Sequence, residues 1–564
     1  MTNASDNFEE KTLEQLMVEL KKWGISPGHD QAAQVMADSR CRVPYEALCL
    51  LLEGGDQGPD HRRTRQAKVE LAWQALLAQW REGQPGPSWL GRLPPFDGEL
   101  FSSGEVMERA SWDYGKVRHR MPAVVLRPAH SEDVAAAVRF CGEEGIGLSP
   151  RGFAHSAGGQ MQVEGGVIID MKSMQRVTAM EDEWCEVEAG AGWDVVLEAA
   201  MEQGRTPPIV TDWLKVSVGG TISMGGFGFM SFWRGTQMDH LLELEVVTGK
   251  GELVRCSARE HEELFNAVKG THGKFGIITK ARIPLEPAPE AVRLVQACYG
   301  DLRTMYADFE RHATQRSTDL IHAFAAEKSR PSIVTKMNST EELGFEEADV
   351  QRLLQSGGSR WVFNLELVDF IGGPHGDDHP PVAVEELQCG EGLVQAWEMD
   401  WKSFCFRVPP LVLEEQFRGA APHPELCAWV PMNGNGLALL EAEFERMDPE
   451  SDTGNGPILF FPLRSALVGA PFFRLPDAEF CLFWGLLRRA EPATADRMAD
   501  LMGDNEALYD RIRAIGGERY LPDTPPETRD FWIHHFAEQW PDIITSRDRW
   551  DPSRVFRGSF GNFS

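Results

Sequence analysis

The pattern of apolar and polar residues divides the chain into a helical first part and a mixed remainder. Apolar residues recur at helical spacing from Leu13 to Leu20 and again from Val69 to Leu77, and this period predicts helices. Glycine- and proline-rich runs at 54–59 and 82–87 interrupt and end them. We therefore expect residues 1–90 to form a helical extension that serves packing or oligomerisation, or alternatively docks a carrier protein or another partner.

The remainder begins with a strand–helix–strand pattern. Ala123–Pro128 is typical of a short strand, and Ser131 is a suitable N-cap for a helix that runs to about Glu144. Gly145 ends that helix before the next strand begins at Ile146, which predicts a βαβ unit. Further strands are expected at Gly166–Asp170, Trp184–Ala189, Leu242–Thr248, Glu252–Cys256 and Phe275–Arg282. Beyond them, apolar strands alternate with amphipathic helices.

Length and charge limit the classes of protein that fit this pattern. A chain of 564 residues is too long for one ordinary core, so we expect two lobes and an extra module. Apolar residues make up 42% of the sequence, which is typical of a globular protein. The net charge of −30 repels phosphate backbones and anionic lipid, so nucleic acid and membrane surfaces are not expected partners.

The cysteines and the N-terminus suggest a cytoplasmic protein. The ten cysteines are scattered, with no CxxC pair and no histidine cluster at zinc spacing. We interpret them as reduced core thiols and expect no metal site. The polar, acidic segment 1–10 lacks the basic and apolar regions of a signal peptide. No later stretch is long and apolar enough to span a bilayer.

Two runs of small residues carry the candidate chemistry. Pro150–Gln160 places a lone histidine, His155, among glycines and alanines between two strand-like segments. Small residues let the backbone approach a ligand closely, and consecutive N–H groups form an anion-binding concavity. About fifty residues later, Pro207–Leu214 leads into a second run at Val216–Ser223. A flat, phosphate-bearing cofactor would suit such loops.

The first run resembles the flavin loop of the FAD-dependent oxidases that share the vanillyl-alcohol-oxidase fold, also called PCMH-type. The second resembles the cytokinin dehydrogenases within that family, and the resemblance covers roughly Met121–Ser564. It implies an α+β fold: a two-lobed architecture with a PCMH-type FAD-binding domain at 95–290, completed by 510–564. An α+β substrate-binding domain at 291–509 and the helical N-terminal extension would make up the rest.

The resemblance also implies roles for individual residues. His155 would be joined covalently to FAD, and Asp212 would take the substrate's N–H proton. Removing hydride from a carbon next to nitrogen develops positive charge, which a nearby carboxylate stabilises. His322 and Trp429 would line the substrate pocket. The expected cofactor contacts are Pro150, Arg151, Gly152, Phe153, Ala154, Ser156, Gln160, Met161, Thr211, Gly219, Gly220, Thr221, Ser223, Gly273, Gly276, Ile277 and Ile278.

Several positions depart from the family pattern. The family has glycine where this chain has Ala154, a glutamate at the pocket mouth where it has His322, and a tyrosine where it has Asp523-Thr524. Arg557–Phe560 replaces a Ser-Pro-Gly-Gln flavin contact. A purine held by those groups would lose hydrogen-bond partners, and polar sites discriminate sharply when such partners change. No cysteine lies between Cys185 and Cys256, so a second covalent flavin bond is not available.

The expected reaction is hydride transfer from a C–H next to nitrogen to covalently bound FAD, giving an imine that water hydrolyses. The partners would be a small-molecule substrate and oxygen or a quinone as electron acceptor. An oxidase of an alcohol or of a biosynthetic intermediate, on the same fold, is the alternative. A flavin-binding scaffold without turnover is a further alternative, against which the intact Asp212 argues.

Overall fold

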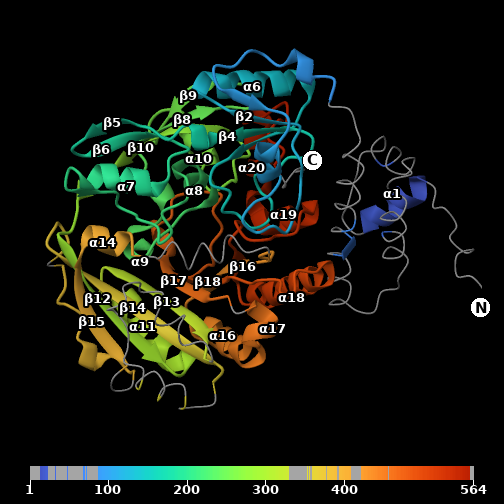
Figure 1. Cartoon of the computed structure of the whole chain (residues 1–564). Coiled ribbons are helices and arrows are strands. Elements are labelled where there is room, and N and C mark those ends of the chain that lie inside the picture. Colours follow the sequence, from blue (N-terminus) through green and yellow to red (C-terminus); the bar gives the residue numbers. More distant parts are fainter. Residues whose placement is uncertain are drawn as a thin grey trace, which may run out of the picture.

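Three sheets of four or more strands and the helices packed on them make up the protein. The computed structural model describes residues 13–22, 87–328, 359–376, 378–389, 393–407, 421–454 and 456–558, with a few isolated positions besides. One sheet has parallel strands and the other two are antiparallel. Helices and strands are thus mixed through the chain, as expected of an α+β protein (Figure 1).

The first sheet contains the predicted βαβ unit. Its strand order is β1-β2-β4-β3, and both β2 and β3 run parallel to β4, which lies between them. Helix α6 connects β2 to β3, and it ends at Gly145, whose φ of +67° is the left-handed conformation that glycine adopts readily. The strands are β1 (Glu99–Phe101), β2 (Val124–Arg127), β3 (Leu148–Arg151) and β4 (Val167–Asp170), and the helices are α5 (Glu105–Ala110) and α6 (Ser131–Glu144).

The start of α6 differs from the prediction that Ser131 is its N-cap. His130 holds the N-cap position, Ser131 is the first helical residue, and no side chain at the N-cap bonds the helix. The carboxylate of Asp133, in the first turn of the helix, instead bonds backbone groups that lie before the helix. It accepts hydrogen bonds of 2.8 to 3.0 Å from the backbone N–H groups of Asp97, Gly98 and Ala129. A carboxylate accepts several N–H groups where a hydroxyl accepts few, so Asp133 fixes this turn.

The second sheet is antiparallel, with strand order β5-β6-β10-β8-β9. Each predicted strand of this region is confirmed to within two residues, whereas the short strands β5 and β7 were missed. The strands are β5 (Val177–Glu181), β6 (Trp184–Glu188), β8 (Glu243–Val247), β9 (Leu253–Cys256) and β10 (Ile277–Pro284); β7 (Arg205–Thr206) pairs with β11 (Glu286–Pro287). The helices are α7 (Trp193–Met201), α8 (Val218–Met224), α9 (Ser231–Arg234) and α10 (Glu262–Ala267).

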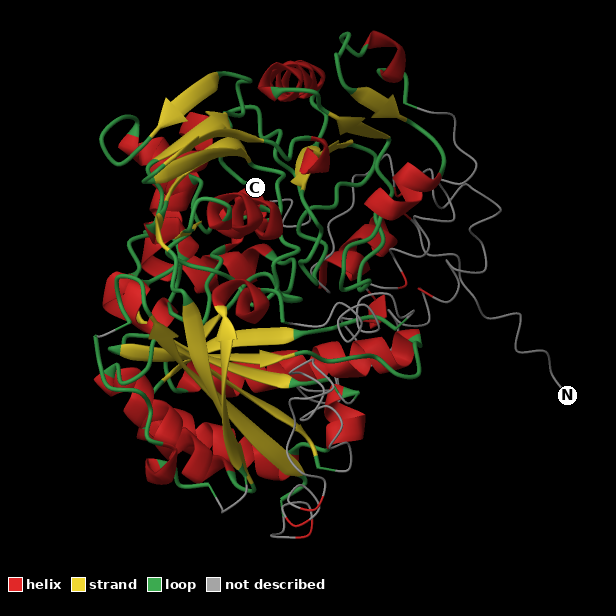
Figure 2. Cartoon of the chain, turned by 60° about the vertical axis from the view of Figure 1, so that its left-hand side comes forward, coloured by secondary structure: helices red, strands yellow, loops and turns green. Residues whose placement is uncertain are grey.

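The third sheet has eight antiparallel strands in the order β15-β12-β14-β13-β17-β18-β16-β19. Helices α11, α16 and α18 pack on one of its faces (Figure 2). The strands are β12 (Ala291–Tyr299), β13 (Leu320–Glu327), β14 (Trp361–Ile371), β15 (Val394–Asp400), β16 (Leu426–Pro431), β17 (Ile458–Arg464), β18 (Phe480–Leu486) and β19 (Glu518–Arg519). The helices are α11 (Leu302–Gln315), α14 (Trp401–Cys405), α16 (Gly434–Arg446), α17 (Pro449–Thr453) and α18 (Ala495–Ala514).

The two faces of this sheet contact different parts of the molecule. Alternate residues such as Ile321 and Ala323 of β13 belong to the core shared with α11, α16 and α18. Residues of the other register, such as Phe461 and Trp429, belong to the core shared with the second sheet. Successive side chains of a strand point to opposite faces. The residues of this second register therefore face the first half of the chain.

The C-terminal segment returns to the first half of the chain. Helices α19 (Arg529–Phe536) and α20 (Trp540–Trp550) lie beside it (Figure 1), and the segment after α20 forms a parallel bridge from Phe556 to Leu148 of β3. The domain boundary expected at residue 510 falls within α18, and strand pairing in the eight-stranded sheet continues to Arg519.

Only part of the predicted N-terminal extension lies within the described residues. Helix α1 (Leu13–Lys22) is a helix at a predicted position, and most of the predicted segment up to residue 80 lies outside. Lys68 Nζ lies 3.0 Å from Asp496 Oδ1 at the start of α18. The cysteines of the described chain are free, and all of them except Cys389 are buried. None of the helices described has the length and apolarity to cross a membrane.

Candidate active site

A cavity lies between the first two sheets and brings the two predicted runs together. Every residue predicted to contact the cofactor lines it except Arg151 and Thr211, and His155 lines it too. Arg151 instead donates to the carbonyl oxygen of Trp112 at 2.7 Å, and this hydrogen bond joins the histidine loop to the segment at Trp112. Thr211 donates to the carbonyl oxygen of Trp213 at 3.1 Å.

The side chain of His155 lines this cavity and is exposed to it. Burial lowers the pKa of its imidazole to about 4, so the ring is neutral at pH 7 and keeps a nitrogen lone pair. The ring of Tyr114 lies 5.2 Å from the His155 ring, and the Tyr114 N–H donates to the carbonyl oxygen of Ala154 at 2.9 Å. Tyr114 thus contacts the histidine loop both through its ring and through its backbone N–H.

The histidine loop offers unpaired backbone donors. Ala154 has a φ of +57°, which turns the chain sharply at this point. Within the described residues, no acceptor is found for the N–H groups of Phe153, Ala154 and Ser156. Buried N–H groups are nearly always paired in proteins, so these donors fit a ligand that bears anionic or carbonyl oxygens, such as the phosphates or ring carbonyls of FAD.

The second run begins a helix rather than the turn that the sequence suggested. Gly219 and Gly220 form the first turn of α8, whose N-cap Ser217 accepts the Gly220 N–H at 3.3 Å. A Cβ atom on Gly219 would lie 2.8 Å from the Cβ of Ala189, and one on Gly152 would lie 2.1 Å from Ser217 Oγ. Glycine at these positions therefore lets α8, β6 and the histidine loop close around the cavity.

Asp212 does not line the cavity. Its side chain is half-buried by surface area but surrounded by protein, and burial raises its pKa. The charges of His322 and Arg407 lower that pKa, and the charge of Glu366 raises it. Glu366 and Arg407 were not predicted from the sequence, because nothing local marks a strand glutamate or a loop arginine as part of a site.

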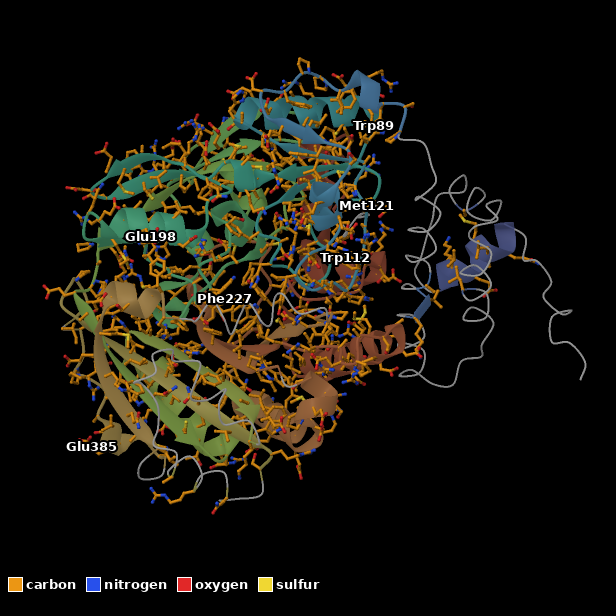
Figure 3. All side chains as sticks on the ribbon, viewed as in Figure 1. Trp89, Trp112, Met121, Glu198, Phe227 and Glu385 are labelled. Carbon is orange, nitrogen blue, oxygen red and sulfur yellow. The ribbon has the colours of Figure 1, made fainter. Side chains whose placement is uncertain are left out.

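Both predicted pocket residues lie on the face of the third sheet that meets the first half of the chain. His322 alternates with residues of the helix-covered core, and so does Trp429. Trp429 is fully buried, with its ring 5.1 Å from that of Phe227 and 5.9 Å from that of Tyr520. Phe227 lies at the junction of the two halves (Figure 3). Trp429 does not line the cavity itself, whereas its neighbour Tyr520 does.

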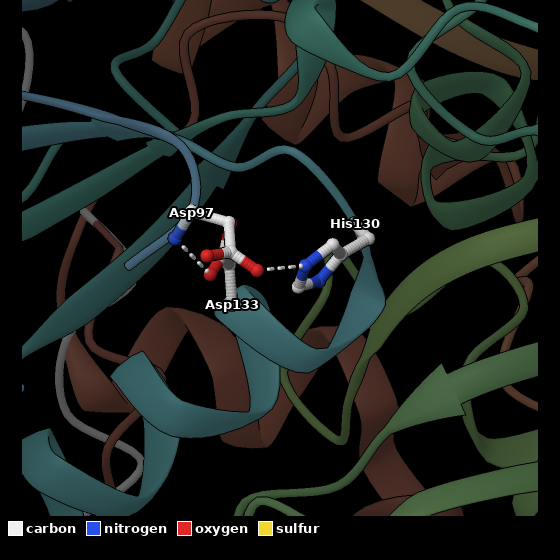
Figure 4. A group of neighbouring side chains, drawn as sticks. All are labelled: Asp97, His130 and Asp133. Carbon is white, nitrogen blue, oxygen red and sulfur yellow. Dashed lines mark hydrogen bonds and ion pairs between the residues drawn. The ribbon is translucent and has the colours of Figure 1, made fainter. Parts of the chain in front are cut away.

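One group within the described residues has the geometry to hold a metal ion: Asp97, His130 and Asp133 (Figure 4). His130 Nε2 lies 2.8 Å from Asp97 Oδ2. The Asp133 carboxylate is already engaged by the backbone N–H groups that fix the start of α6. None of these three residues lines the cavity.

Comparison with known proteins agrees with this geometry. Residues 122–257 match the family model described as FAD binding domain, and residues 289–560 match the model described as cytokinin dehydrogenase 1, FAD and cytokinin binding. An uncharacterised oxidoreductase from ORF5 of the fasciation locus of Rhodococcoides fascians is 30% identical, over 79% of this chain and 94% of its own. Cytokinin dehydrogenase 7 of Oryza sativa subsp. japonica is also 30% identical, over 79% of this chain and 88% of its own.

The chain belongs to the cytokinin dehydrogenase family. It is therefore an FAD-dependent oxidoreductase, and the predicted resemblance is confirmed. Cytokinin dehydrogenase 8 of Oryza sativa subsp. indica, at 31% identity over 80% of this chain and 90% of its own, is a further relative. Neither of the two family models covers residues 1–121.

Asp523, Thr524 and Arg557, which belong to the departures from the family pattern, do not line the cavity. Thr524 Oγ1 donates to the carbonyl oxygen of Glu425 at 2.6 Å, and the Asp523 carboxylate accepts from Arg519 Nε at 2.8 Å. These residues anchor the segment after β19, whereas Tyr520 and Pro522 of the same segment line the cavity. Of Arg557–Phe560, the last two residues lie outside the described ones, and Arg557 donates its N–H to Leu148.

A buried carboxyl group, that of Glu425, contacts the histidine loop through Tyr114. Tyr114, whose ring packs on His155, donates its hydroxyl to Glu425 Oε1 at 2.9 Å. Burial raises the pKa of Glu425 to about 8, and the hydrogen bond from Tyr114 opposes that rise. Neither residue was predicted from the sequence.

The remaining cavity residues also escaped prediction. Ser217, His272, Tyr520 and Pro522 stand next to residues that the sequence singled out, so their motifs gave a usable signal. Small apolar residues such as Ala189 gave none, since their place in the cavity follows from strand register. The complete set of unpredicted lining residues is Ser149, Met171, Ala189, Val216, Ser217, Met224, Gly226, His272, Tyr520 and Pro522.

Proposed function

We propose that this member of the cytokinin dehydrogenase family oxidises a small amine at a C–H next to nitrogen, using FAD attached covalently through His155, and gives an imine that water hydrolyses. One observation carries the proposal: His155 projects into a cavity built from the glycine-rich histidine loop and the glycine-rich start of α8. A flat cofactor with phosphates fits such a cavity, because backbone donors are available there and side chains would block it.

The residues around the cavity would hold the cofactor in two ways. The unpaired N–H groups of the histidine loop would bind its oxygens, and the neutral imidazole of His155 would carry the covalent link. FAD bound there would supply a two-electron oxidant that accepts hydride from the substrate. The link would fix the position of the ring relative to the third sheet.

Asp212 would act as the base. Loss of hydride from a carbon next to nitrogen makes that nitrogen strongly acidic, and a carboxylate nearby both stabilises the positive charge and accepts the proton. Burial raises the pKa of Asp212, which brings the carboxylate closer to the basicity that proton transfer at neutral pH requires. The relatives named cytokinin dehydrogenase support an amine of the cytokinin type as the first substrate to try.

The second candidate reaction for this protein is oxidation of an alcohol or of a biosynthetic intermediate. The observation that favours it is His322, which stands where the resemblance predicts a glutamate at the pocket mouth. A neutral imidazole gives a substrate one acceptor fewer than a carboxylate does. Oxygen or a quinone would reoxidise the flavin in either case.

Anaerobic bleaching of the flavin tests the choice of substrate. We expect isoprenoid adenines and related amines to bleach the absorbance near 450 nm in the wild type. Asp212→Asn should keep its flavin and slow the bleaching by about 10²–10⁴-fold. Asp194→Asn removes a carboxylate that pairs with Lys215, within the same half of the chain, and is the control expected to bleach normally. Bleaching by alcohols alone would establish the second chemistry instead.

A further inference from the structure

The segment that follows α5 binds the histidine loop on both sides of His155. The Tyr114 N–H donates to the carbonyl oxygen of Ala154 at 2.9 Å, directly before the histidine. The Asp113 carboxylate accepts the N–H of Gly159, four residues after it. Neither Asp113 nor Tyr114 lines the cavity. These two residues therefore fix the backbone that carries His155 while leaving the cavity open.

Gly115 brings the same segment into close contact with the loop. A Cβ atom on Gly115 would lie 1.9 Å from the carbonyl oxygen of Ala157, so a side chain at this position would push the loop away. The Gly115 carbonyl oxygen accepts the N–H of His423 at 2.7 Å. His423 lies just before β16, so the segment joins the histidine loop to the third sheet.

The ring of Tyr114 packs against two imidazoles. Its centre lies 5.2 Å from that of the His155 ring, with 31° between the planes. It lies 4.6 Å from that of the His423 ring, with 28° between the planes. Of the two histidines, only His155 lines the cavity. The position of the Tyr114 ring therefore limits the positions that the His155 ring can adopt there.

The hydroxyl group of Tyr114 has two buried partners. It donates to Glu425 Oε1 at 2.9 Å and lies 3.2 Å from His423 Nδ1, and both partner residues are buried. A hydroxyl has one proton and two lone pairs, so it can donate to Glu425 and accept from an Nδ1–H of His423 at the same time. The Tyr114 side chain is thus anchored at its far end as well as at its backbone.

We propose that Tyr114, anchored by Glu425 and His423, is the positioning residue that holds the His155 ring in the orientation in which it bonds to the flavin. This inference rests on the proposed function. Formation of the link breaks the imidazole N–H bond and one C–H bond of a methyl group on the flavin, and it forms one N–C bond. The two protons and two electrons that are released pass through the flavin to oxygen, which becomes hydrogen peroxide.

The anchor matters because one imidazole nitrogen must lie close to one methyl carbon. A misplacement of about 1 Å can slow a reaction between held groups by about 10²-fold. Tyr114→Phe keeps the ring and the backbone bond to Ala154 and removes only the anchored hydroxyl. We expect this variant to form the link about 10-fold more slowly than the wild type, and Tyr114→Leu, which also removes the ring, to be slowed by about 10²-fold.

The time course of link formation measures this effect without any substrate. Full-length protein is produced in riboflavin-limited cells, FAD is added in air, and samples are precipitated with acid at intervals. Flavin that stays in the pellet is covalently linked. In Tyr114→Phe the limiting rate at saturating FAD should fall, while the FAD concentration that gives half of this rate should stay at the wild-type value. A merely structural role would weaken FAD binding instead.

Two substitutions of Glu425 test the anchor from its other side. Glu425→Gln keeps an acceptor for the Tyr114 hydroxyl and should form the link at the wild-type rate. Glu425→Leu removes the acceptor and should be as slow as Tyr114→Phe. Equal rates in the two Glu425 variants would contradict the anchor.

Tyr299→Phe is the matched control for Tyr114→Phe. The Tyr299 hydroxyl donates to Asp308 Oδ2 at 2.8 Å, and both residues are buried. Tyr299 belongs to the helix-covered core of the third sheet. The control therefore removes the same kind of hydrogen bond without touching the histidine loop, and its link should form at the wild-type rate.

Failure of the proposed link would give a different result from failure of the anchor. A wild type that never retains flavin in the pellet would overturn the covalent link, and this inference with it. If the wild type forms the link and Tyr114→Phe forms it equally fast, the link stands and the positioning role is wrong. A weaker binding of FAD with an unchanged limiting rate would also overturn the positioning role.

Discussion

At the scale of the residue, the β-carbon of Ala154 is a source of strain beside His155. Alanine in the left-handed region costs about 1–2 kcal/mol relative to its usual conformations, and Ala154 has a φ of +57°. Glycine relieves that strain but adds unfolded-state entropy. We therefore predict that Ala154→Gly raises the free energy of unfolding by about 0.5–1 kcal/mol. Denaturant unfolding measures this, and Ala157→Gly, in the same loop at a negative φ, should instead destabilise.

Glu425 is a second residue whose effect depends on its environment. Burial raises the pKa of this carboxyl to about 8, so the neutral form is favoured in the folded state. The stability that it contributes is present below its unfolded pKa and is lost as pH rises towards its folded pKa. Glu425→Gln keeps the acceptor for Tyr114 and does not titrate. Its stability relative to wild type should therefore increase from pH 5 to pH 7, by up to about 1.4 kcal/mol per pH unit. A difference that is independent of pH would show that Glu425 is ionised in the folded protein.

At the scale of the element, the approach of α8 to the end of β6 sets the width of the cavity. A methyl group on Gly219 would meet the Ala189 Cβ at 2.8 Å, so α8 would have to shift away from the histidine loop. We predict that Gly219→Ala reduces the flavin content, measured as the ratio of absorbance at 450 nm to that at 280 nm. Gly434→Ala is the control, since nothing lies within 4 Å of its new methyl group. An unchanged ratio in Gly219→Ala would show that the helix is not needed in this position.

The elements of the first half of the chain were predictable because local signals agree there. Glycine ends α6 at Gly145, and apolar runs give β2, β4 and β8 to within two residues. The contacts at the start of α6 were not predictable, because Asp133 accepts hydrogen bonds from the backbone of Asp97 and Gly98, more than thirty residues earlier in the chain. The pairing of Glu366 with His322 also depends on register between strands, which a single sequence does not contain. Local signals thus predicted the helices and strands, whereas contacts between distant segments of the chain could not be predicted from the sequence.

At the scale of the whole molecule, none of the described residues of the N-terminal extension lines the cavity. The cavity is lined by residues from Ser149 to Pro522, and the ion pair of Lys68 with Asp496 joins the extension to the outer end of α18. We predict that a chain beginning at residue 87 keeps its flavin content and its bleaching rate to within about twofold, since surface ion pairs contribute roughly 0–1 kcal/mol. Loss of flavin from the shortened chain would show that the extension supports the cavity. Packing, oligomerisation and partner docking by residues 1–90 remain predictions, as does a cytoplasmic location.

The covalent link through His155 is the central claim, and acid precipitation tests it most directly. The protein is precipitated with acid, and the yellow colour is followed in the pellet and in the supernatant for the wild type, for His155→Ala and for His130→Ala, a control histidine outside the cavity. The account predicts colour in the wild-type and His130→Ala pellets and none in the His155→Ala pellet. Release of the colour from the wild type into the supernatant would contradict the covalent link, and a colourless wild type would contradict the assignment of the cavity to FAD.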